Sequence, residues 1–135
     1  MIVLDSSFIV AYHNTRDAHH APAARTMVRL AGGEWGQAVL LEYVFLEIVT
    51  VLRARMDLTT AATVGAALLH AREIEFVGCS EIFLEAFDAF RHQTAGELSF
   101  VNAAILTVAR RQSPGFVATF DEDFRGQPGV TVVPA

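Results

Sequence analysis

The chain begins with a short apolar segment that runs directly into an acid, and this segment constrains the fold more than any other. Residues 2–4 (Ile-Val-Leu) place apolar side chains on both faces of a predicted strand. Strands that are apolar on both faces are typical of parallel sheets covered by helices on either side. Asp5 is then expected at the carboxyl end of the strand, where open parallel sheets bind ligands. Asp5 can be a site residue or a helix cap, and Ser6 or Ser7 can also cap the following helix.

Predicted strands alternate with predicted helices along the rest of the chain. This alternation predicts an α/β fold with a central, mostly parallel sheet of four to five strands. No linker is long enough to divide the chain, so residues 1–135 are expected to form one domain. The predicted helices cover residues 6–12, 17–30, 41–56, 59–71, 80–93 and 99–112, and the predicted strands cover residues 2–4, 35–40, 73–77, 116–119 and 130–133.

The composition bounds the partners and the compartment. Ten basic and fifteen acidic residues give a net charge of −5, so binding to nucleic acid would need a local basic patch or metal ions. No apolar run approaches the ~18 residues of a membrane span, which predicts a protein without a membrane segment. Cys79 is the only cysteine, so no disulfide within the chain is possible. With no signal-peptide pattern before or around Asp5, we expect a cytoplasmic protein.

Two acids follow predicted strands, and a third lies on a helix. Asp5 follows the first strand and Asp121 follows the fourth. If these strands are neighbours in a parallel sheet, the two carboxylates face one site, which suits a hard cation such as Mg²⁺. Glu47 has no charged residue three or four positions away on its own helix, and Glu42 also borders the apolar face of that helix. Helical periodicity alone does not choose between Glu42 and Glu47.

Four segments, in this order, resemble the successive motifs of PIN domains, and the likeness extends to the closing strand and Pro134. In size and compactness the chain is similar to the VapC-type toxins of prokaryotic toxin–antitoxin pairs. The segments are residues 3–9 (Val-Leu-Asp-Ser-Ser-Phe-Ile), 43–48 (Tyr-Val-Phe-Leu-Glu-Ile), 98–105 (Leu-Ser-Phe-Val-Asn-Ala-Ala-Ile) and 118–121 (Ala-Thr-Phe-Asp).

The resemblance implies a three-layer α/β/α fold and a small endoribonuclease that depends on Mg²⁺ or Mn²⁺. Its register favours Glu47 over Glu42. Asp5, Glu47 and Asp121 match acidic positions of the family, Asp123 falls where some members have a further acid, and Thr119 and Ser6 match polar positions around the metal.

Asn102 is the one position of these motifs that departs from the family, which has an aspartate there. Asn102 offers a single neutral carbonyl oxygen, and its NH₂ group cannot face a cation. The predicted metal site, Asp5, Glu47, Asn102 and Asp121, therefore lacks one negative charge. A naturally impaired enzyme and a deliberately inactivated one both fit this residue. Asn102, three positions after Ser99, can also simply satisfy the start of its helix.

The resemblance also implies partners, namely an RNA substrate, a cognate antitoxin and a second copy in a homodimer. Phe8, Ile9 and Tyr12 are expected to expose an apolar face for such interfaces. Some of the arginines at positions 16, 25, 29, 110 and 111 are expected to meet RNA phosphates. The alternative function is a catalytically inactive PIN-like scaffold that acts by binding RNA or a protein partner.

Other activities that use an aspartate after the first strand fit less well. A phosphatase of the haloacid dehalogenase type needs a second aspartate two residues later, where this chain has Ser7. That family and the response-regulator receivers both need a lysine, and the chain contains none. The glycine motifs of nucleotide-binding proteins and serine hydrolases are absent from the sequence as well.

Overall fold

Five parallel strands form the centre of the computed structural model, which describes residues 1–94, 96 and 98–135. The sheet order is β3-β2-β1-β4-β5, so the first strand lies in the middle. Each neighbouring pair is parallel, and the alternation seen in the sequence predicted this class of sheet. The strands are β1 (Ile2–Leu4), β2 (Ala38–Leu41), β3 (Ile74–Val77), β4 (Gly115–Ala118) and β5 (Val130–Val133).

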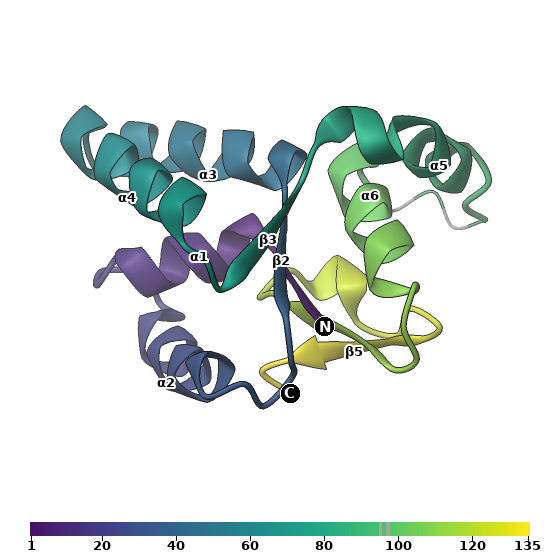
Figure 1. Cartoon of the computed structure of the whole chain (residues 1–135), viewed down its shortest axis with the longest axis horizontal. Coiled ribbons are helices and arrows are strands. Elements are labelled where there is room, and N and C mark those ends of the chain that lie inside the picture. The colour runs from purple at the N-terminus through teal and green to yellow at the C-terminus, as the bar shows by residue number, and fades with distance from the viewer. Residues whose placement is uncertain (95, 97) are drawn as a thin grey trace.

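Helices cover the sheet on both sides, which gives the expected α/β/α layers (Figure 1). In that view the pairs α1–α2 and α3–α4 lie to the left of β2, and α5 and α6 lie together to the right. The helices are α1 (Ser6–His13), α2 (His20–Ala31), α3 (Glu42–Arg55), α4 (Leu58–His70), α5 (Cys79–Arg91) and α6 (Phe100–Ala109), and a 3₁₀ turn, η1, spans Glu122–Phe124.

The pairing of β1 with β4 decides where the predicted site lies. Leu4 pairs with Ala118, and the backbone N–H of Asp5 donates to the carbonyl of Ala118 at 3.0 Å. Thr119 continues the pairing towards β5, where its N–H donates to the carbonyl of Val133 at 3.0 Å. The two strands that precede Asp5 and Asp121 are therefore neighbours, as the predicted site required.

The apolar residues of β1, β2 and α1 form much of the core. All residues of β1 and β2 are buried, in keeping with strands that are covered on both faces. Phe8 and Ile9 are 0% and 1% exposed, and Tyr12 is half-buried. The expectation that these three side chains form an exposed interface is therefore wrong, because α1 uses this face to pack against the core.

Two local predictions about helix starts are also wrong. α2 begins at His20 rather than at Asp17, because the Asp17 carboxylate accepts a hydrogen bond from the backbone N–H of His19 at 2.8 Å and closes a turn. The residue at the N-cap position of α1 is Asp5 rather than Ser6 or Ser7, and its side chain makes no capping hydrogen bond. Within the part of the chain that is described, no helix has the length and apolar character needed to cross a membrane.

Candidate functional site

Asp5 lies buried at the carboxyl end of β1, with only 3% of its surface exposed. The hydroxyls of Thr119 and Ser7 donate to its Oδ2 atom at 2.6 Å and 2.8 Å. Desolvation by burial raises the pKa of the Asp5 carboxyl above its ordinary value of 3.8, and the charge of Glu47 adds to this rise. Hydrogen bonds from Thr119 and Ser7 oppose the rise because they favour the ionised form.

Thr119 joins Asp5 to the second predicted acid. Its side chain is fully buried, and its Oγ1 atom, which donates to Asp5, also accepts the backbone N–H of Asp121 at 2.9 Å. One oxygen of Asp121, Oδ1, accepts the backbone N–H of Asp123 at 2.9 Å. In the described part of the chain, the exposed side chain of Asp123 forms no hydrogen bond with the predicted site residues. Only the backbone N–H of Asp123 helps to fix Asp121.

Asn102 reaches the same place from α6. Ser99 caps this helix, as the sequence predicts, and its hydroxyl accepts the backbone N–H of Asn102 at 3.1 Å. The Asn102 side chain is 8% exposed, and its Nδ2 atom donates to Oδ2 of Asp121 at 3.2 Å. The amide of Asn102 therefore provides the Asp121 carboxylate with a neutral hydrogen-bond donor.

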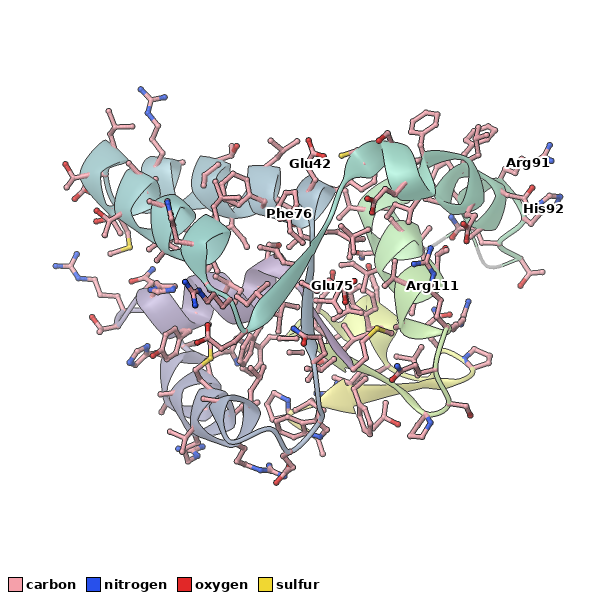
Figure 2. The ribbon with its side chains drawn as sticks, in the orientation of Figure 1. Glu42, Glu75, Phe76, Arg91, His92 and Arg111 are labelled. Atoms are coloured by element: carbon pink, nitrogen blue, oxygen red, sulfur yellow. The ribbon has the colours of Figure 1, made fainter. Side chains whose placement is uncertain are left out.

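Glu47 and Glu42 point to different parts of the molecule. The hydroxyl of Ser6 donates to Oε1 of Glu47, which brings Glu47 beside Asp5. Glu42 lies at the start of α3, next to the start of α5 (Figure 2), where its Oε1 accepts the backbone N–H of Cys79 at 2.9 Å. Glu42 thus caps another helix, and Glu47 is the residue of this pair that the fold places at the predicted site.

These contacts define what the site can hold. Thr119 is bonded to Asp5 and to the backbone of Asp121, Glu47 lies near Asp5, and Asn102 is bonded to Asp121. Among the described residues, no three His, Cys, Asp or Glu side chains form a group that could hold a metal ion. The donor chemistry, carboxylate oxygens with one amide oxygen, fits a hard divalent cation.

A cleft of about 350 Å³ opens beside these residues. Ser6 and Asp121 contribute to its wall, so the cleft adjoins the predicted site. Its lining is completed by Ser7, Val10, Asp17, His19, Val51, Arg55 and Phe120.

A family model described as PIN domain matches residues 2–129. The chain belongs to the PIN domain family. This match confirms the resemblance drawn from the four sequence segments, and no curated protein matches the sequence significantly.

Solved structures agree with the family. Over 92% of each chain, with 26% sequence identity and a TM-score of 0.78, this PIN domain is similar to VapC20 of Mycobacterium tuberculosis, described as a toxin that cleaves the sarcin-ricin loop. A toxin–antitoxin complex from Klebsiella pneumoniae is similar in fold, with 17% identity, a TM-score of 0.65, and coverage of 97% of this chain and 96% of that one.

Sequence reasoning missed the basic residue of the cleft in this PIN domain. Arg55 lines the cleft from the last turn of α3, and it was not among the arginines expected near RNA. Three of the arginines expected near RNA are engaged elsewhere. Arg29 pairs with Glu34, Arg110 donates to the carbonyl of Pro128, and Arg111 pairs with Glu85 on the α5–α6 side of the molecule (Figure 2).

The raised pKa of Asp5 predicts how stability depends on pH. For a carboxyl whose pKa rises on folding, the stabilising contribution is complete below the unfolded value of 3.8 and is lost as the pH rises through the folded value. In EDTA we therefore expect Asp5→Asn to be more stable than the original chain at pH 7, by about 1 kcal/mol, a common size for one substitution. The advantage should shrink towards pH 4.

Asp57 provides a control of opposite sign. Hydrogen bonding from Thr60, at the start of α4, lowers the pKa of the exposed Asp57 carboxyl. The contribution of Asp57 is present above the unfolded pKa and is lost as the pH falls, so Asp57→Asn should lose stability relative to the original chain as the pH rises. Chemical denaturation from pH 4 to pH 8 measures both trends. A difference between Asp5→Asn and the original chain that does not vary with pH would contradict the assignment to Asp5.

Proposed function

We propose that this PIN domain is a metal-dependent endoribonuclease toxin of the VapC type, weakened by Asn102 and inhibited by a cognate antitoxin. The PIN family is a family of nucleases. The observation that carries the proposal is that Thr119 joins Asp5 to Asp121 at the carboxyl ends of β1 and β4, with Glu47 near Asp5 and Asn102 bonded to Asp121. The similarity to VapC20, which covers nearly the whole chain, supports the same conclusion.

The residues of the site would divide the work as follows. Asp5 and Asp121, with the Oδ1 atom of Asn102, would hold a Mg²⁺ or Mn²⁺ ion. Glu47 would bind the same ion or position the attacking water. The bound ion would supply an acidified water and balance the charge that develops on the phosphate.

The hydrogen bonds of the chain support these roles by fixing the carboxylates beforehand. Thr119 and Ser7 orient Asp5, and Ser6 orients Glu47. The backbone of Asp123 orients Asp121. Preorganised ligands need little rearrangement when they bind a metal or a phosphate, so these hydrogen bonds support a catalytic role over a purely structural one.

The proposed partners other than RNA are an antitoxin and a second copy of the chain. An antitoxin forms part of the similar complex from Klebsiella pneumoniae. An arginine of an antitoxin would suit the carboxylates of Asp5 and Asp121, because guanidinium pairs well with carboxylate. Exposed apolar side chains lie on α3–α4 (Leu46, Leu58, Leu69) and on α5 (Phe83, Leu84, Phe87), and they are the surfaces offered for these contacts in place of α1.

The contact between Asn102 and Asp121 favours a second candidate function. The Asn102 amide gives the Asp121 carboxylate a hydrogen-bond donor from the protein itself. Such a contact is expected in a PIN-like scaffold that binds RNA or a protein but does not cleave RNA. Cleavage of RNA by this chain and by Asn102→Asp, with Mg²⁺, Mn²⁺ or EDTA, tests the proposal. Absence of cleavage by both proteins on a broad set of RNAs would favour the scaffold.

A further inference from the structure

We propose that His19 and Phe120 form a platform on which an unpaired RNA base stacks, and that Arg55 binds a phosphate of the same strand. This inference rests on the proposed function, because it names how the cleft beside Asp121 would hold the RNA. The evidence is the ring geometry, the anchoring of the loop that carries His19, and the charge of the cleft.

The rings of His19 and Phe120 are stacked on one another. The centroids of His19 and Phe120 lie 4.5 Å apart, with an angle of 9° between the ring planes. Phe120 in turn stacks on the buried ring of Phe8, with the centroids 6.2 Å apart. The backbone N–H of Phe120 donates to Ser7 Oγ at 2.9 Å. A fixed core ring therefore supports the platform from below.

The loop between α1 and α2 holds His19 at this place. Asp17 accepts the backbone N–H of His19, and the N–H of Asp17 donates to the carbonyl of Asn14 at 2.9 Å. The next residue, His20, is tied to the carbonyl of Ala11 through Nδ1 at 2.9 Å. These contacts fix the backbone on both sides of His19, while its side chain stays exposed to a ligand.

Arg55 supplies the positive charge that this acidic protein lacks elsewhere in the cleft. The chain has a net charge of −5, and Asp17 and Asp121 both line the cleft. Arg55 forms no ion pair with any residue in the described part of the chain, so its guanidinium is available for a phosphate. A flat exposed ring beside a free guanidinium matches a single-stranded nucleotide, which presents a base face and a phosphate.

Binding of a labelled single-stranded RNA, measured by fluorescence anisotropy with Ca²⁺ in place of Mg²⁺, tests the platform. We expect His19→Ala to raise Kd about tenfold, the usual size of one base–aromatic stack, and His19→Phe to bind as the original chain does. Arg55→Ala should raise Kd about fivefold and lower the salt dependence by about one phosphate contact. Arg53→Ala is the matched control without effect, since Arg53 lies on the same helix but lines another groove.

RNAs with single abasic positions separate stacking from other contacts. For the original chain, one abasic position should weaken binding about as much as His19→Ala does, and the same position should have no further effect on His19→Ala. The inference is overturned if the original chain does not bind the RNA, if His19→Ala binds as tightly as the original chain, or if His19→Phe fails to restore binding. His19-dependent binding without cleavage by Asn102→Asp would refute the nuclease proposal and leave the platform standing. Cleavage by Asn102→Asp together with RNA binding that does not depend on His19 would refute the platform alone.

Discussion

Asn102→Asp is expected to cleave RNA on the order of 100-fold faster than the original chain in Mg²⁺ or Mn²⁺. The substitution replaces an amide that donates to Asp121 with a carboxylate, which would complete the proposed set of acidic ligands. The added carboxylate should bind the ion more tightly and help to balance the charge that develops on the phosphate. Together these effects are expected to lower the activation free energy by about 3 kcal/mol. Initial rates on a labelled RNA measure the gain.

The same substitution should make stability depend on metal. Without an ion, the new carboxylate repels that of Asp121, so the melting temperature of Asn102→Asp in EDTA should fall below that of the original chain. Added Mn²⁺ should reverse the loss, because a ligand of the folded state stabilises it. Glu47→Gln in the same background is the control that removes cleavage but keeps the volume of the side chain. A rate that does not increase in Asn102→Asp, although the protein binds Mn²⁺, would contradict the assignment of Asn102 to the metal site.

Thr119→Val is expected to lower the free energy of unfolding by about 2–3 kcal/mol, the cost of leaving buried polar groups without partners. The Thr119 hydroxyl donates to Asp5 and accepts from the backbone of Asp121, and valine can do neither. Because the bond from Thr119 lowers the pKa of Asp5, its loss should raise that pKa further. In an Asn102→Asp background, the acidic limb of the pH–rate profile should therefore move to higher pH.

Thr119→Ser is the matched control, since it keeps the hydroxyl and removes only a methyl group. We expect it to retain the pH profile and to lose less than half of the stability that Thr119→Val loses. Urea denaturation and the pH dependence of cleavage give the two readouts. If Thr119→Val and Thr119→Ser were equally stable and shared one pH profile, Thr119 would not link Asp5 to Asp121.

Much of the fold could be predicted because its signals are local. The apolar residues of β1 marked a strand covered on both faces, and the alternation of segments marked a parallel sheet. Ser99 correctly marked the start of α6, which fixes where Asn102 lies. The choice of Glu47 over Glu42 came from the family register, and its structural reason, the contact of Glu42 with Cys79, spans 37 residues.

The features that sequence analysis missed depend on contacts between distant parts of the chain. Ser7 and Thr119 are 112 residues apart in sequence, and their hydroxyls lie 3.1 Å from one another. His19 was not among the predicted site residues, and nothing near it in sequence reveals the ring of Phe120. Phe8 was expected at an interface because an apolar residue on a short helix reads the same whether it faces a partner or the core.

Asp5, Glu47, Asn102 and Asp121 are the residues proposed to hold the metal ion. Anomalous diffraction from crystals of this chain and of Asn102→Asp soaked in Mn²⁺ tests this proposal most directly. We expect a manganese peak within about 2.5 Å of carboxylate oxygens of Asp5 and Asp121, with higher occupancy in Asn102→Asp. Manganese bound elsewhere in both crystals, with these side chains pointing apart, would contradict it.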